Sequence, residues 1–312
     1  MRPDISRKEL ILDGRLHGTL TTPPGEGPHP AALILMPGKL DRDGNLGKGR
    51  IDLGPALATA LAERGVAAYR YDRRGVGATP GDWMATGFHE HRQDAATALR
   101  ELAKLPGIGP VGAIGYSEGA LHAAALGARE GAAAVVMISG HAKTGEETLL
   151  WWAAGKDAEG LSWPLKLVAL LLGRSTMRGL AAKMAAKLKA TKGDVARLYG
   201  VRLGARSMRE FLVYDPKKDL SEVRVPLLAL TGAKDVQVDP ADLETIADVV
   251  PGPAETRRVP DLTHLLRRDP GPATQRTYGR QYGEPVDAGL VEEVAAWTAQ
   301  RLGAGSPAGG SR

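Results

Sequence analysis

The sequence predicts an α/β fold: a mostly parallel eight-stranded sheet with helices on both faces and an inserted helical cap. Short apolar strands alternate with helical segments along most of the chain, a pattern typical of parallel sheets that are buried on both faces. The alternation stops once, from His141 to Val213, where the sequence indicates only helix. The predicted core therefore comprises residues 1–140 and 214–302, and the predicted cap comprises residues 141–213.

The elements follow from local patterns. Two antiparallel strands open the chain, because Asp13-Gly14 is suited to the positive φ of a tight hairpin turn. Most later strands are continuously apolar, and the helices between them have apolar residues at helical spacing. The predicted strands cover residues 8–12, 16–21, 31–36, 66–71, 109–116, 132–139, 226–231 and 254–260. The predicted core helices cover residues 53–64, 89–105, 117–129, 241–250 and 286–302. The tail, residues 303–312, is expected to be disordered.

Composition excludes several classes of site. Cysteine is absent from the 312 residues, so disulfides, thiolate metal sites and a cysteine nucleophile are excluded. The first ten residues contain five charged side chains and no apolar stretch, so no signal peptide is visible and a cytoplasmic protein is expected. The longest apolar run, residues 161–173, is too short to span a membrane and is interrupted by Pro164 and Lys166.

The net charge of +5 is concentrated in the predicted cap. Residues 141–213 contain 13 Lys or Arg and 6 Asp or Glu, whereas the rest of the chain contains 28 and 30. The basic segment has no recognisable nucleic-acid-binding motif, so nucleic acid is not an expected partner. Its charge either attracts an anionic or carrier-bound substrate or forms a solvated face on an alanine-rich helix. The sequence leaves the oligomeric state open.

Ser117 is the candidate nucleophile. It lies in Gly115-Tyr116-Ser117-Glu118-Gly119, which fits G-x-S-x-G between an apolar strand and an alanine-rich helix, the context of a nucleophile elbow. The serine of such a turn has a strained, positive φ, and the neighbouring chain passes so close that both flanking positions require glycine. The turn raises the hydroxyl above the sheet and directs helix amides at an oxyanion. The alternative is a serine that only caps the helix.

A serine needs a positioned base, and the sequence offers seven histidines. In a parallel sheet, chemistry collects at the carboxyl ends of the strands. His264 follows the last strand at that end and is the predicted base. His141 also follows a strand end and is the main competitor, whereas His122 is too close to Ser117 on the same helix to face its hydroxyl.

The imidazole in turn needs a carboxylate that fixes its tautomer. Asp235 follows the strand at residues 226–231 directly and is the predicted acid. Asp239 is less favoured because the following Pro240 suggests that it is a helix N-cap. Asp261 is a weaker third candidate, because it is only three residues from His264.

The order nucleophile, acid, base is that of the α/β-hydrolases, and four motifs extend the similarity. The chain resembles the α/β-hydrolase superfamily over nearly its whole length, and more narrowly the capped bacterial esterases of the serine-aminopeptidase-like branch. The motifs are D-R-D-G at residues 41–44, Y-D-x-R-G-x-G at 71–77, S-E-G at 117–119 and G-x-x-D-x-Q-V at 232–238.

Three stretches carry further expectations. Many relatives have H-G or G-S-G where this chain has Met36-Pro37-Gly38, and Asn where it has Thr263. The first departure changes the approach to the oxyanion hole. The segment at residues 71–77 is expected to be structural, with Asp72 accepting hydrogen bonds from backbone amides.

The resemblance implies a serine hydrolase that cleaves a carboxylic ester or related acyl bond of a small molecule through an acyl-enzyme on Ser117. It also implies an oxyanion hole made by the backbone N–H groups of Lys39 and Glu118, with no metal or organic cofactor. The same triad could serve an acyltransferase, a cyclase or a thioesterase. A non-hydrolytic lyase or a binding protein on this fold is a further alternative.

Overall fold

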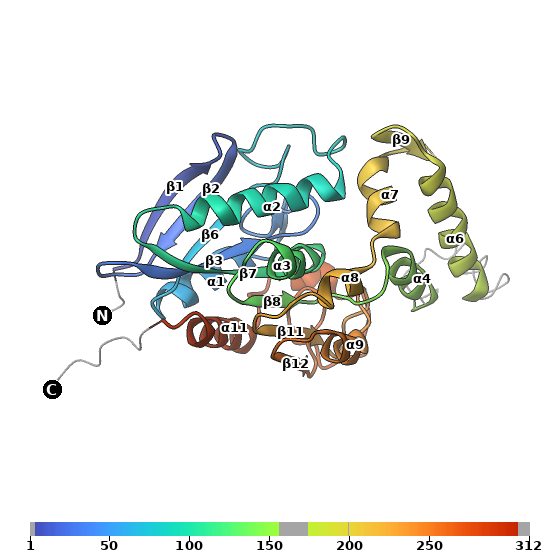
Figure 1. Ribbon diagram of the computed structural model, residues 1–312. Coiled ribbons are helices and arrows are strands. Elements are labelled where there is room, and N and C mark those ends of the chain that lie inside the picture. Colours follow the sequence, from blue (N-terminus) through green and yellow to red (C-terminus); the bar gives the residue numbers. More distant parts are fainter. Residues whose placement is uncertain (1–3, 156–173, 199, 305–312) are drawn as a thin grey trace.

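The computed structural model describes residues 4–155, 174–198 and 200–304. Its centre is an eight-stranded sheet with the strand order β1-β2-β6-β3-β7-β8-β11-β12 (Figure 1). The pairs β1–β2 and β2–β6 are antiparallel, and the pairs from β6 through β12 are parallel, which confirms the predicted sheet. The strands are β1 Ser6–Leu12, β2 Leu16–Thr22, β3 His29–Leu35, β6 Ala67–Tyr71, β7 Ile108–Tyr116, β8 Val135–Ile138, β11 Leu227–Gly232 and β12 Ala254–Val259.

Helices cover both faces of this sheet, and each face has its own apolar core. On one face the core includes side chains of α2 (Phe88–Ala103), α3 (Glu118–Arg129) and α9 (Asp242–Val249). On the other it includes side chains of α1 (Leu53–Ala62) and α11 (Ala288–Arg301). From Ala31 to Leu35, successive residues of β3 alternate between the two cores, so burial on both faces explains why this stretch is continuously apolar.

The segment between β8 and α8 (Pro216–Leu220) extends away from the sheet (Figure 1). It contains α4 (Gly145–Gly155), α6 (Arg174–Ala190) and α7 (Ala205–Val213). The prediction of helix alone was wrong, because β9 (Val195–Leu198) and β10 (Val201–Gly204) form an antiparallel hairpin. Gly200 turns this hairpin with a φ of 82°, a conformation that glycine adopts without a steric penalty.

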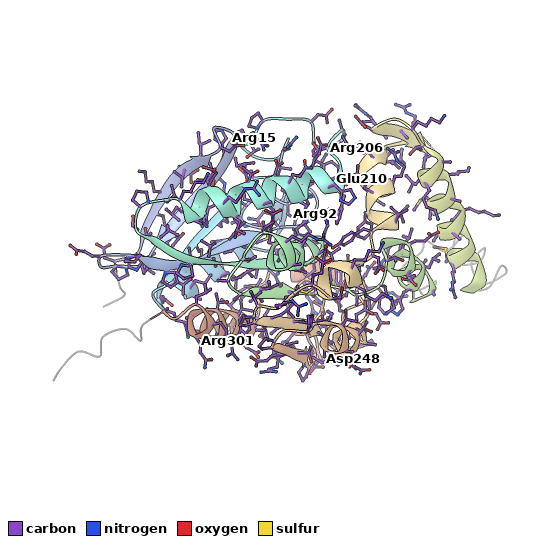
Figure 2. All side chains as sticks on the ribbon, in the orientation of Figure 1. Arg15, Arg92, Arg206, Glu210, Asp248 and Arg301 are labelled. Carbon is purple, nitrogen blue, oxygen red and sulfur yellow. The ribbon has the colours of Figure 1, made fainter. Side chains whose placement is uncertain are left out.

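Helix α7 joins this segment to the core. Arg206 Nη1 lies 3.0 Å from a carboxylate oxygen of Glu90, and the His89 backbone N–H donates to Glu210 Oε2 at 3.0 Å. Both contacts are at the first turn of α2, where free amide groups attract a carboxylate. Figure 2 shows Arg206 and Glu210 on the side of α7 that faces α2.

Other differences from the sequence prediction are short. Strand β8 begins at Val135 instead of residue 132, because the Ala132 N–H still bonds to the carbonyl of Leu126 in α3. The elements that the prediction missed are β4 Asn45–Leu46, β5 Gly49–Arg50, α8 and α10 Tyr278–Gln281. The apolar run at 161–173 and nearly all of the tail lie outside the described residues. Among the described helices, none is long and apolar enough to cross a membrane.

Candidate active site

Ser117 occupies a sharp turn between β7 and α3. Its φ is 54° and its ψ is −120°, a strained combination for a residue with a side chain. A Cβ atom on Gly115 would lie 2.0 Å from the Gly119 carbonyl oxygen, and one on Gly119 would lie 2.3 Å from that of Leu35. The turn therefore requires glycine at both positions, as the sequence pattern indicated.

Asp235 and His264 meet at the carboxyl ends of β11 and β12. His264 Nδ1 and Asp235 Oδ2 are 2.7 Å apart, and both side chains are buried. The second oxygen of Asp235 accepts the N–H groups of Gln237 at 2.8 Å and Val238 at 2.9 Å. These two bonds hold the carboxylate in place, and because Nδ1 faces Asp235, Nε2 of His264 is directed away from it.

The loop that carries His264 is held from three sides. The Tyr116 hydroxyl donates to the His264 carbonyl at 2.7 Å, which links this loop to the residue before Ser117. Thr263 Oγ1 donates to Gln281 Oε1 at 2.7 Å. The threonine that stands where many relatives have asparagine is therefore hydrogen-bonded. The buried Arg267 donates to the carbonyls of Leu265, Ile51 and Glu284. The loop that carries the predicted base is thus held by hydrogen bonds to segments that are distant in the sequence.

The competing histidines have other partners. His141 Nδ1 lies 2.8 Å from the Lys143 carbonyl oxygen, and His122 Nε2 lies 3.3 Å from Glu118 Oε1. Burial lowers the pKa of both imidazoles. Neither is hydrogen-bonded to a carboxylate at the ends of β11 and β12, so His264 is the better-placed base.

The competing carboxylates are also engaged elsewhere. Asp239 forms an ion pair with Lys143 at 2.9 Å, and Asp261 forms one with Lys234 at 2.7 Å. The N-cap of α9 is Ala241, so the predicted N-cap was displaced by two residues. Asp239 still caps the turn that leads into the helix, because its Oδ1 accepts the N–H of Ala241 and its carbonyl accepts that of Asp242, both at 3.0 Å.

One predicted oxyanion donor lies in the loop after β3, and the other lies in the elbow itself. Lys39 follows β3 after Gly38, whose φ is 53°, and Glu118 is the first residue of α3. Among the described residues, neither backbone N–H donates a hydrogen bond to another residue. Free amides of this kind can bind an anionic oxygen.

The loop at residues 71–77 has the structural role expected of it, and a further one. Asp72 accepts the N–H groups of Arg42 at 2.8 Å and Ala78 at 2.9 Å. The sequence pattern gave no role to Arg73, because it occupies a variable position of Y-D-x-R-G-x-G. In the structure Arg73 is 6% exposed and bonds to both Gly38 and Glu118. Within the described ranges, no group of three His, Asp or Glu side chains is arranged to hold a metal ion.

Comparison with known proteins finds one matching family and a related esterase. The family model described as serine aminopeptidase, S33, matches residues 52–271. Esterase EstD from Thermotoga maritima is 26% identical over 296 residues, which are 94% of this chain and 67% of EstD.

Two solved structures share the fold. One is Est1E from Butyrivibrio proteoclasticus with bound ferulic acid (TM-score 0.61, 15% identity), and the match covers 94% of this chain and 99% of Est1E. The other is 2,6-dihydroxy-pseudo-oxynicotine hydrolase (TM-score 0.60, 19% identity), and the match covers 100% of this chain and 72% of that one. The expected α/β-hydrolase fold is confirmed.

Proposed function

Because the chain belongs to the serine aminopeptidase S33 family of α/β-hydrolases, we propose that it cleaves carboxylic esters through an acyl-enzyme on Ser117. Hydrolysis is the general activity of this family, and the relative named Esterase EstD supports esters as the substrate class. The 2.7 Å hydrogen bond between His264 and Asp235, at the same edge of the sheet as Ser117, carries the assignment of the residues.

In the proposed reaction, His264 Nε2 takes the proton of the Ser117 hydroxyl while the oxygen attacks the ester carbonyl. Asp235 stabilises the imidazolium that forms. The carbonyl oxygen becomes an oxyanion that accepts the N–H groups of Lys39 and Glu118. His264 then gives the proton to the departing alcohol oxygen, which leaves the acyl group on the serine.

The second half of the reaction repeats these steps with water. His264 takes a proton from a water molecule, and the hydroxide attacks the acyl-enzyme carbonyl. The same two amides hold the second oxyanion, and collapse releases the carboxylic acid as the proton returns to Ser117. Each proton and electron pair is thus accounted for by groups of this chain and water.

We further propose that residues 141–213 form a cap that selects the substrate. The contacts of α7 with the first turn of α2 support this idea. The surplus of positive charge in this segment would attract an anionic substrate to the active site around Ser117. The value of kcat/KM for an anionic ester should then fall as salt rises, whereas that for a neutral ester should stay constant.

A fluorophosphonate probe tests the assignment of the nucleophile. We expect it to label Ser117, and Ser117→Ala to abolish both labelling and turnover of a short p-nitrophenyl ester. Ser139→Ala is the matched control, because Ser139 is also buried at the end of a parallel strand with a positive φ of 49°. This variant should still be labelled. Labelling that survives Ser117→Ala but not Ser139→Ala would contradict the proposal.

Product analysis in the presence of a competing alcohol distinguishes hydrolysis from acyl transfer. A hydrolase releases mainly the free acid, because water reaches the acyl-enzyme. A transferase or cyclase excludes water and yields mainly the new ester or the ring.

A further inference from the structure

The guanidinium group of Arg73 contacts both segments that carry the proposed oxyanion donors, the loop after β3 and the first residue of α3. Nη1 donates to the Gly38 carbonyl at 3.3 Å, and Nη2 donates to Glu118 Oε1 at 2.8 Å. On the basis of the proposed function, we propose that Arg73 is a positioning residue that aims the N–H groups of Lys39 and Glu118 at the oxyanion.

The first contact acts through a peptide plane. The carbonyl of Gly38 and the N–H of Lys39 belong to one planar peptide unit and point in opposite directions. Any bond that fixes the carbonyl therefore fixes the N–H. The Gly38 carbonyl accepts from Arg73 and also from Trp83 Nε1 at 3.1 Å. The peptide cannot rotate without losing both bonds. The two bonds to the Gly38 carbonyl therefore fix the direction of the Lys39 N–H on the opposite side of the peptide.

The second contact acts through a side chain. Arg73 Nη2 and His122 Nε2 both contact Oε1 of Glu118, at 2.8 Å and 3.3 Å. Burial opposes ionisation, but the Arg73 charge and the His122 hydrogen bond outweigh it and hold the pKa of the Glu118 carboxyl well below its usual range. An ionised Glu118 keeps its bond to Arg73. This bond anchors the first residue of α3 immediately after the strained turn at Ser117.

The effect we assign to Arg73 is directional. Its charge is balanced by the Glu118 carboxylate, so the pair contributes little net field at the oxyanion. What Arg73 supplies is a planar fork with two nitrogens that reach two acceptors, one in the loop after β3 and one on α3. Lysine has the same charge but a single nitrogen on a flexible chain. It cannot hold the Gly38 carbonyl and the Glu118 carboxylate in the same fixed geometry.

Arg73→Lys and Arg73→Gln test this role. We expect kcat for p-nitrophenyl butyrate to fall about 10- to 100-fold in both variants, somewhat less than the loss of an oxyanion donor itself. KM should change by less than about threefold, because ground-state binding does not need the oxyanion hole. Affinity for a trifluoromethyl ketone, which forms a tetrahedral oxyanion on the serine, should fall in parallel with kcat.

The neighbouring arginine provides a matched control. Arg74 is also a partly buried guanidinium in the same loop, but it binds Asp94 through Nε at 2.5 Å and Nη2 at 2.8 Å, on α2. Arg74→Gln should lower the thermal midpoint, as the loss of a buried ion pair does. Its kcat should stay within about threefold of wild type. A purely structural role for Arg73 would make the two arginine variants behave alike.

Wild-type kcat in folded Arg73→Lys, or a loss confined to KM, would overturn the inference. If neither Arg73 variant folds, Glu118→Ala decides, since it removes the acceptor of Arg73 beside the elbow and keeps the backbone N–H of residue 118. A fall in kcat at constant KM and reduced ketone affinity would then support the inference, and unchanged kcat would overturn it. An inactive, unlabelled wild type, or an active Ser117→Ala, would instead overturn the proposed function and the inference with it.

Discussion

The buried His91 should make the protein lose stability in mild acid. His91 lies inside α2 at 3% exposure, and its Nδ1 has no hydrogen-bond partner among the described residues. Burial, together with repulsion from Arg73, lowers its pKa to about 2, although Glu118 opposes the shift. The folded protein therefore keeps His91 neutral at pH 5, whereas the unfolded chain takes up a proton below about pH 6.5.

The size of the effect follows from these two pKa values. The folded-state pKa is below the unfolded one, so the contribution of His91 to stability is complete above pH 6.5 and is lost as the pH falls. Between pH 7.5 and 5.0 the free energy of unfolding should fall by about 2 kcal/mol from this residue alone. His122, whose pKa burial also lowers, adds to the loss in the same direction.

Urea unfolding at pH 7.5 and pH 5.0 measures this loss. His91→Leu removes the titrating group, so the loss between the two pH values should be smaller in the variant by about 2 kcal/mol. Leu99→Ala is the matched control, because Leu99 is buried on the same helix at 3% exposure and does not titrate. It should lower stability equally at both pH values. An equal loss in wild type and His91→Leu would refute the reasoning.

Three further substitutions test the candidate site. Asp235→Asn should lower kcat by about 10⁴-fold in a folded protein, because the amide cannot stabilise the imidazolium and imposes the wrong tautomer. Tyr116→Phe leaves the His264 carbonyl without its buried donor, and should cost about 1–3 kcal/mol in urea unfolding as well as lowering kcat. Gly119→Ala places a methyl group 2.3 Å from the Leu35 carbonyl oxygen, and this overpacking should lower the free energy of unfolding by about 1–3 kcal/mol.

Each of these has a clear contrary result. Asp239→Asn serves as the control for the acid, and an equal fall in kcat in that variant would remove the distinction between the two aspartates. Tyr116→Phe with wild-type stability and kcat would show that the His264 loop needs no support from the elbow. Gly119→Ala with wild-type stability would mean that α3 can move away from β3 without cost.

The sequence predicted the sheet well because its signals are local. A stretch buried on both faces, such as Ala31 to Leu35 of β3, is apolar at every position whatever lies beside it. The turn at Ser117 was equally predictable. Its two glycines are required because a side chain at either position would collide with the motif itself or with the adjacent strand β3. The positions of the candidate residues directly after strands then predicted that they lie at the carboxyl edge of the sheet.

The contacts that remained hidden join distant segments. Nothing near Arg73 in the sequence indicates that its side chain reaches Gly38 and Glu118, which are 35 and 45 residues away. The β9–β10 hairpin was missed because its four-residue strands lie beside a helical, alanine-rich region and only Gly200 marks the turn. Asp235 could be chosen over Asp239 from its position after the strand, and Asp239 has the predicted capping bond, although the N-cap of α9 lies two residues later than predicted.

The most direct test is to trap the acyl-enzyme. The p-nitrophenyl ester of dimethylcarbamic acid should acylate a serine hydrolase and deacylate slowly, so peptide mass spectrometry after acid quenching locates the modified residue. We expect one dimethylcarbamoyl group on Ser117 in the wild type and none in His264→Gln. Modification of another residue with Ser117 left free, or release of p-nitrophenol at the wild-type rate by His264→Gln, would contradict the account.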